Sequence, residues 1–487
     1  MAADTLKSKT ISSLVWKLSE RGGSSLVSLV IQIVLARLLA PEQFGMLAII
    51  LVFVNLGNVF VQSGLNTALV QAREVSGKDY STVFWMCCSI ALIFYIALYI
   101  FAPSIALFYH SEEITWPLRT LGLVLFVNAY NSVQVAKATR ELEFKKIFFS
   151  TIVAALVSGL IGVISAICGA GLWALVIQQV INQTANCVVL AFQIAWRPRF
   201  TIDVRRAKVF FGFSWKLLAS GLLGVGYQSL SDLIIGKQFS TANLGLVSQG
   251  KKYPQAIGSM LDGAIQPVML SVISRVQDNA DYVKRLTRRA LKTSSFLIVP
   301  SMTMLAVVAE PLTRTLLGEQ WLETVPFMQM YCFVYALLPM HTANLQTLNG
   351  LGRSDLFLKL EILKEACGVT ILLFSVVVTQ NVYFVVASYM VVGAICTFVN
   401  AWPNRRIIRY SYAEQVRDIL PAFLLTAISV LATLPLGFVN LPDVVAILAR
   451  CFVMVSVYLG FAKLLKVEAF SYLISTGMDL LSDRSRS

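Results

Sequence analysis

The chain has 487 residues, of which 57% are apolar and 14% are charged, and it carries a formal net charge of +14. Soluble domains carry about 25% charged residues, so this composition excludes a soluble globular protein and indicates an integral membrane protein. Cytoplasmic loops explain the excess of Lys and Arg more simply than nucleic-acid binding does. The eight cysteines and two histidines show no metal-ligand spacing, so we expect no metal and no other cofactor.

Apolar stretches predict an all-α membrane protein with about fourteen transmembrane helices, since one span needs about 20 apolar residues. The predicted limits are 11–39, 44–66, 81–108, 114–136, 147–169, 172–195, 209–236, 243–274, 290–317, 325–349, 356–378, 382–402, 418–438 and 443–465. The range 243–274 is the least typical of a span, because it contains Lys251, Lys252 and Asp262 together with prolines and glycines.

The loops between these ranges differ in charge. Those that follow even-numbered spans are basic, namely 137–146, 196–208, 275–292 and 405–417, whereas the opposite loops are short or acidic. The positive-inside rule therefore predicts that the basic loops and both termini lie in the cytoplasm. The simplest interpretation of a basic loop is a topology signal, and added contact with an anionic substrate is the alternative.

A weak internal repeat with a period of about 200 residues relates the two halves. Trp16-Lys17 recurs as Trp215-Lys216, and FGML aligns with LGLV so that Gly45 matches Gly245. An even number of spans separates the copies, which makes the repeat parallel. It predicts a six-helix lobe over 1–200, a second over 201–404, and two further transmembrane helices with a cytoplasmic tail over 405–487.

The first and seventh predicted spans each carry a polar face. Residues four apart share one helical face. The first face contains Lys17, Arg21 and Gln32, with Glu20 close by, and the seventh contains Lys216, Gln228 and Asp232. A charge at the bilayer centre costs about 2.5–3.5 kcal/mol on insertion scales, so we expect these residues to line a central cavity between the lobes. The alternative is that the basic residues snorkel to lipid headgroups.

Other intramembrane polar residues allow two interpretations each. Lys251 and Lys252 either line the cavity or anchor their helix at the membrane interface. Asp232 and Asp262 are expected to pair with the lysines, and ion binding is the alternative. A polar stripe on the second span, formed by Asn55, Asn58 and Gln62, either contacts sugars or makes hydrogen bonds between helices.

Seven stretches spread along the chain carry a family signal. They are ARLLAPEQFGMLAI, LEFKKI, GLWALVIQQ, WRPRF, LIIGKQFSTANLGLVSQGKKYP, GEQWLETVPFMQM and LNGLGRSDLFLKLE. In this order they resemble the polysaccharide flippase family of O-antigen, colanic-acid and teichuronic-acid exporters. That family belongs to the superfamily of multidrug, oligosaccharidyl-lipid and polysaccharide exporters. The resemblance runs from about residue 8 to about residue 465.

The resemblance implies a flippase rather than an enzyme. Its substrate would be an undecaprenyl-diphosphate-linked oligosaccharide, moved to the outer leaflet of the bacterial plasma membrane by alternating access for surface polysaccharide synthesis. Polymerase and glycosyltransferases of the same pathway would be its partners. The resemblance also implies fourteen helices in two lobes around a V-shaped cavity, with the diphosphate on basic residues such as Lys17, Arg21 and Lys216.

Three other functions compete with this interpretation. A cation-coupled multidrug extruder of the same superfamily would rely on acidic cavity residues, but intramembrane Lys and Arg are more numerous here. A polyprenyl-sugar membrane enzyme would have a large outer loop or clustered acidic residues, and the sequence shows neither. A structural or signalling membrane protein would not need polar faces in both halves.

Overall fold

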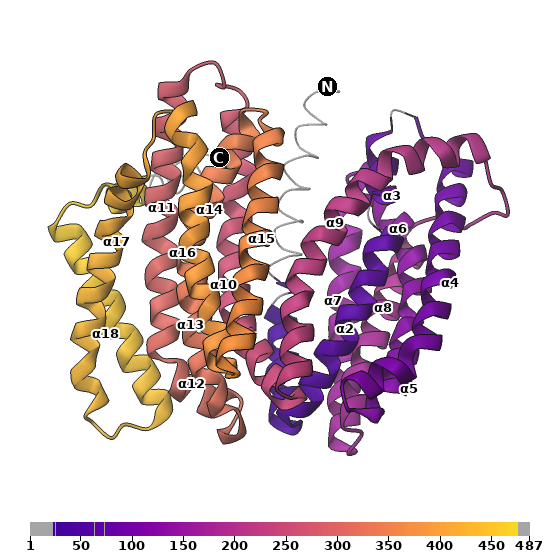
Figure 1. Ribbon diagram of the computed structural model, residues 1–487, viewed down its shortest axis with the longest axis horizontal. Coiled ribbons are helices and arrows are strands. Elements are labelled where there is room, and N and C mark those ends of the chain that lie inside the picture. The colour runs from indigo at the N-terminus through magenta and orange to yellow at the C-terminus, as the bar shows by residue number, and fades with distance from the viewer. Residues whose placement is uncertain (1–22, 25, 63, 73, 476–487) are drawn as a thin grey trace. The chain divides into compact units, whose positions relative to one another are not determined.

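The computed structural model describes residues 23–24, 26–62, 64–72 and 74–475 (Figure 1). All regular structure in these ranges is helical, which confirms the predicted all-α fold. By length and apolar composition, nine helices of the described ranges are suited to crossing a membrane. The chain is therefore a multi-pass membrane protein. It divides into two compact units, Met1–Ser248 and Gln249–Ser487.

The first unit begins, within its described part, with the helix Leu26–Leu38. The helices that follow are α2 (Pro41–Gln62), α3 (Leu65–Gln71), α4 (Gly77–Phe108), α5 (Thr115–Gly122), α6 (Val124–Arg140), α7 (Phe144–Ile167), α8 (Leu172–Gln193) and α9 (Val204–Gln238). The helices α7 and α8 pack along each other, α4 packs against α6, and α9 packs against α2, α3 and α4. The short 3-10 helix η1 (Glu112–Ile114) connects α4 to α5.

The helix α10 (Thr241–Ile273) crosses the division between the units. The helices of the second unit that follow it are α11 (Ala280–Val307), α12 (Ala309–Leu316), α13 (Val325–Ala336), α14 (Leu338–Gly350), α15 (Ser354–Thr379), α16 (Val382–Ile407), α17 (Tyr412–Thr433) and α18 (Asp443–Leu464). The helix α11 packs against α13, α14 and α17, and α17 also packs against α18. The 3-10 helices η2 (Glu319–Thr324) and η3 (Leu434–Gly437) connect α12 to α13 and α17 to α18.

Helices occupy the described part of every predicted span, but several spans are interrupted. The range 114–136 divides at Leu123 into α5 and α6, and the range 325–349 divides at Leu337 into α13 and α14. Each of these broken pairs follows a 3-10 helix and precedes two long helices. From this 3-10 helix onward, the two halves of the chain therefore share the same order of elements. The lobe limits stay a prediction. The total of fourteen spans stays a prediction.

The repeat and the compact units divide the chain at different positions. The predicted lobes meet at residue 200, whereas the first compact unit extends to Ser248. The reason is that α9, which opens the predicted second lobe, packs on α2, α3 and α4. The predicted lobes are defined by similarity within the sequence. The compact units are defined by how the helices pack.

Two glycines at equivalent positions of the repeat make reciprocal contacts inside the first unit. A Cβ atom on Gly45 would overlap the carbonyl oxygen of Thr241, and one on Gly245 would overlap that of Pro41. Each of these Cβ positions also lies 3.1 Å from the backbone nitrogen of the other glycine. Pro41 and Thr241 begin α2 and α10, so both helices start with a close backbone approach that only glycine permits.

Candidate functional site

Several predicted cationic residues lie outside what the structure describes. Lys17, Glu20 and Arg21 belong to residues 1–22, which are not among the described ranges. Lys216 lies within α9, but its side chain is also outside the described set. The cationic site proposed from the polar faces of the first and seventh spans therefore stays a prediction.

The remaining predicted polar residues of α9 and α10 lie on described parts of these helices. Lys251 and Lys252 are adjacent on α10 and both are half-buried. On α9, Asp232 is half-buried and Gln228 is exposed. Gln249, which the sequence analysis did not select, is almost fully buried beside the two lysines. Its amide has no hydrogen-bond partner among the described residues.

Asp262 is bound by polar neutral groups in the second unit. Its carboxylate accepts hydrogen bonds from the Gln266 amide one turn along α10 and from the Thr342 hydroxyl of α14. Among the described side chains, Asp262 takes part in no ion pair of the second unit. Among the described residues, the hydrogen-bond partners of Asp262 are thus a hydroxyl and an amide, whereas the sequence analysis favoured a lysine.

The polar stripe of α2 provides one hydrogen bond between helices. Asn128 of α6 donates from Nδ2 to Asn58 Oδ1 over 2.8 Å. Asn55, one turn earlier on α2, is exposed, and Gln62 is half-buried, as is Gln32 on the preceding helix. For Asn58, the geometry favours the alternative of a hydrogen bond that joins two helices.

The loop 194–203 is attached to the beginning of α4, a contact that the sequence analysis missed. The backbone N–H of Arg199 donates to Ser81 Oγ, and that of Asp203 donates to Thr82 Oγ1, each over 3.1 Å. Trp85 Nε1 donates to the Arg199 carbonyl over 2.9 Å. These bonds hold the loop against α4 immediately before α9 begins.

An ion pair completes this attachment. Arg206 of α9 donates from Nε to Asp79 Oδ1 over 2.6 Å and from a terminal nitrogen to Oδ2 over 3.0 Å. The Asp79 side chain is 6% exposed, and it also accepts from the backbone N–H of Ser76 as half of a capping box. The spacing of Ser76 and Asp79 is a sequence signal for such a cap, so the start of α4 was detectable. The Arg206 partner was not, because it lies 127 residues away.

The second unit contains a cluster of ion pairs that joins α11 to α17. Here α11 provides the cations and α17 the anion, since Arg288 Nε lies 2.6 Å from Asp418 Oδ2 and Lys292 Nζ lies 3.5 Å from Oδ1. Tyr410, in the turn before α17, donates its phenol to the same carboxylate over 2.8 Å. Burial raises the pKa of Tyr410 above its usual value, and the hydrogen bond to Asp418 raises that pKa further. The phenol is therefore a stable donor at neutral pH.

No group of three or more metal-ligating His, Cys, Asp or Glu side chains is found together among the described residues. The eight cysteines form no disulfide in the structure. The described residues of this region provide hydrogen-bonding groups and positive charge. They also form ion pairs and hydrogen bonds that join helices.

Comparison with known proteins identifies the family. The family described as "Polysaccharide biosynthesis protein" matches residues 34–326, which is more than half of the chain. The chain is 23% identical over 351 residues to the succinoglycan biosynthesis transport protein ExoT of Rhizobium meliloti, covering 72% of this chain and 71% of that protein. It is 22% identical over 375 residues to the teichuronic acid biosynthesis protein TuaB of Bacillus subtilis, covering 76% and 77% of the two chains.

A solved structure shares the fold. The lipid II flippase MurJ in an inward closed conformation superimposes with a TM-score of 0.78, covering 93% of this chain and 98% of MurJ. At 14% sequence identity, this similarity concerns the fold alone. The family match, the order of helices and the membrane-suited composition agree with one another. The chain belongs to the polysaccharide biosynthesis protein family and has the fold of a membrane flippase.

Proposed function

We propose that the protein moves an undecaprenyl-diphosphate-linked oligosaccharide from the inner to the outer leaflet of the bacterial plasma membrane by alternating access. One observation carries this proposal, namely that a polysaccharide biosynthesis family match and a lipid II flippase fold occur in the same chain. The relatives are named for polysaccharide biosynthesis and transport. The protein would supply repeat units for a surface polysaccharide such as lipopolysaccharide or exopolysaccharide, without catalysing a reaction on them.

The proposed site for the diphosphate is cationic. Ammonium and guanidinium groups bind phosphate through charge-assisted hydrogen bonds, and Arg can do so with two parallel bonds. The basic residues assigned to this role are Lys17, Arg21, Lys216, Lys251 and Lys252. The assigned neutral and acidic residues are Glu20, Gln32, Asn55, Asn58, Gln62, Gln228, Asp232 and Asp262. The neutral ones would offer donors and acceptors to sugar hydroxyls, whereas the acidic ones would balance the cations.

The proposed setting follows from the charge of the loops. The basic loops and both termini would face the cytoplasm, where glycosyltransferases assemble the substrate, and a polymerase would extend the repeat units on the outer side. The two predicted lobes, 1–200 and 201–404, would be the halves that alternate, with 405–487 as an addition.

The rival function is a multidrug extruder of the same superfamily. It is less supported, because the family match and the two relatives concern polysaccharide biosynthesis. The two functions make different predictions for a charged lipid cargo. A multidrug extruder would move small amphiphilic cations and leave a lipid-linked oligosaccharide in its original leaflet.

Reconstitution tests the proposal directly. The full chain is inserted into liposomes that contain a fluorescent undecaprenyl-diphosphate oligosaccharide in both leaflets, and a membrane-impermeant quencher reports how much label is exposed outside. We expect the quenched fraction to rise from about one half towards completion as label crosses. A fraction that stays at the value of protein-free liposomes, together with uptake of a cationic dye, would establish the rival function instead.

A further inference from the structure

The helix α9 is attached to α4 at both of its ends. At its start, Arg206 Nε donates to Asp79 Oδ1 over 2.6 Å. Near its end, Lys237 Nζ donates to the Phe108 carbonyl over 2.6 Å and lies 4.4 Å from the centre of the Phe108 ring. Asp79 lies in the first turn of α4, and Phe108 is the last residue of that helix. Because both of its ends are held, we expect α9 to move together with α4.

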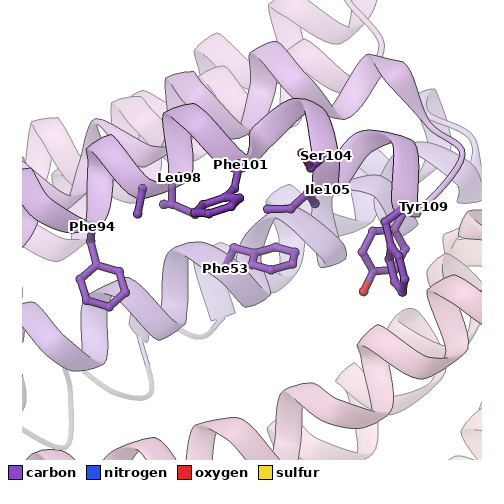
Figure 2. A pocket seen from close by; sticks show the side chains of 9 residues that line it. Phe53, Phe94, Leu98, Phe101, Ser104, Ile105 and Tyr109 are labelled. Carbon is purple, nitrogen blue, oxygen red and sulfur yellow. The ribbon is translucent and has the colours of Figure 1, made fainter.

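The helix α4 is in turn packed against α2. The ring centroids of Phe60 on α2 and Phe94 on α4 lie 4.3 Å apart. At an apolar pocket between the same two helices, Figure 2 shows Phe53 of α2 facing Phe101 and Ile105 of α4. The helices α2, α4 and α9 therefore form one body within the first unit.

The first turns of α10 also belong to this body. The backbone at Gly245 lies so close to the start of α2 that a Cβ atom there would overlap the Pro41 carbonyl oxygen and lie 3.1 Å from the Gly45 nitrogen. These contacts are made by main-chain atoms, so side-chain movement does not loosen them. The start of α10 is therefore fixed to α2, inside the first unit.

Five positions after Gly245, α10 is packed against helices of the second unit. A Cβ atom on Gly250 would lie 2.8 Å from Phe327 Cβ and 3.0 Å from the backbone nitrogen of Met328, both on α13. About two turns later, a Cβ atom on Gly258 would lie 2.8 Å from Tyr335 Cδ1, which is also on α13. From Gly250 onward, α10 is thus fixed to the second unit.

The helix is weakest where it passes from one unit to the other. Pro254 has no N–H group, so the Gly250 carbonyl lacks the hydrogen bond that an α-helix forms four residues on. In a straight helix the proline ring would also clash with that carbonyl, and prolines are a main cause of sharp kinks. Glycine in a helix interior is itself destabilising. Both residues lie just after the boundary between Ser248 and Gln249.

We propose that residues 246–254 of α10 form the hinge about which the two compact units move. This inference rests on the proposed function, because it keeps alternating access and assigns the boundary between the moving parts. The predicted lobes would put that boundary in the loop 194–203, but hydrogen bonds to Ser81 and Thr82 hold this loop against α4. The helix α9 accordingly moves with the first unit, although it opens the predicted second lobe.

The experiment measures the distance between one spin label in each unit of the full chain in nanodiscs. The labels are carried by an unnatural amino acid at Arg205 and at Asp278, which are both exposed, so the eight cysteines stay unchanged. Pro254→Ala restores the missing N–H group. Pro267→Ala is the matched control, because it makes the same change in the part of α10 that lies wholly in the second unit.

We expect the natural chain to populate at least two distances. Pro254→Ala should shift the ratio between them by about two- to tenfold, the size of one backbone hydrogen bond, whereas Pro267→Ala should keep the natural ratio. A single narrow distribution in the natural chain would overturn the proposal, because the units would then not move. An unchanged ratio in Pro254→Ala, or equal shifts in both variants, would overturn it as well.

Hydrogen exchange of the natural chain tests the hinge without a variant. The backbone amides of residues 250–253 should exchange about tenfold faster than those of residues 259–262 in the same helix, because bending opens the helix locally. Equal rates in the two stretches would contradict a hinge at this position. This measurement decides the question even where Pro254→Ala does not fold.

The two proposals fail separately. A chain that flips the oligosaccharide lipid in liposomes, but whose label distances do not depend on Pro254, refutes the hinge and keeps the flippase function. A chain whose distances shift as expected, but which leaves the lipid in its original leaflet, refutes the flippase function and keeps the hinge.

Discussion

Arg206 and Asp79 join the start of α9 to the start of α4 through two parallel hydrogen bonds of 2.6 and 3.0 Å. A terminal nitrogen of the same guanidinium also donates to the Glu74 carbonyl over 3.1 Å. The carboxylate is buried, whereas the guanidinium is about one-third exposed. The charge that most needs a partner is therefore that of Asp79, and both residues of the pair serve to fix where α9 begins.

Removing this ion pair should destabilise the protein measurably. Breaking a buried pair costs about 3–5 kcal/mol, and partial exposure of Arg206 reduces this to about 2–3 kcal/mol for Arg206→Ala. Asp79→Ala should cost more, because it also removes half of the capping box with Ser76. The measurement is thermal unfolding in detergent by circular dichroism. Arg205→Ala is the control, since Arg205 is exposed and its hydrogen bond to Asp203 uses only its backbone. Equal melting temperatures for all three variants would contradict the importance of the pair.

Alanine at either repeat-related glycine should be severely disruptive. The new Cβ at Gly45 or Gly245 would overlap a backbone carbonyl oxygen, which no side-chain movement relieves, so the cost should reach about 3 kcal/mol or more. Gly226→Ala is the matched control, because nothing lies within 4 Å of its Cβ position. Loss of a glycine in a helix there should be neutral or stabilising by about 0.5–1 kcal/mol. The yield of folded protein in membranes and its melting temperature check both outcomes.

The cationic-site prediction concerns Lys17, Arg21 and Lys216. We expect Lys17→Ala combined with Arg21→Ala to abolish polymer export while the protein still inserts into the membrane. Lys216→Ala should impair export more than Arg409→Ala, since Arg409 is interpreted only as a topology residue. The measurement is surface polysaccharide per cell, normalised to protein in the membrane fraction. Full polymer yield from the double variant would refute the prediction that Lys17 and Arg21 bind the substrate.

Alkaline pH should reduce the stability that the hydrogen bond from the Tyr410 phenol to Asp418 contributes. The folded-state pKa of Tyr410 is raised by burial and by Asp418, so its stabilising contribution is fully present below the unfolded pKa of about 10. That contribution is lost progressively as the pH rises from there towards the folded pKa. Tyr410→Phe should cost about 1 kcal/mol at neutral pH and should show a shallower decline of stability above about pH 10. Melting curves of both proteins from about pH 7 to about pH 11 test this, and parallel curves would refute it.

Hydropathy predicted the approximate positions of the helices well, but it predicted their first and last residues less well. The predicted span 290–317 begins ten residues after α11 does, because the first turns of α11 are rich in Arg and Lys. Asn279 caps this helix by accepting from the Tyr282 N–H. Val283, Leu286 and Leu291 lie on its buried side, a helical spacing that the apolar criterion overlooked. The breaks at Leu123 and Leu337 differ in their signals. Gly122 immediately precedes the first break, whereas Pro339 follows the second.

The candidate site was less accessible to sequence reasoning than the fold. Asp262 was selected as a polar residue inside a predicted span, but its hydrogen-bond partner Thr342 lies 80 residues away on α14. Nothing in the composition of either helix identifies the other. The Lys237 ammonium lies 4.4 Å from the centre of the Phe108 ring. This contact depends on how α4 and α9 pack, which one sequence does not specify.

The paired glycines also bear on which substitutions the start of α2 and the start of α10 tolerate. Each glycine leaves the space that the backbone of the other helix fills, so a larger residue at either position meets main chain rather than a movable side chain. A compensating change at a neighbouring side chain cannot relieve such an overlap, so each position constrains the other.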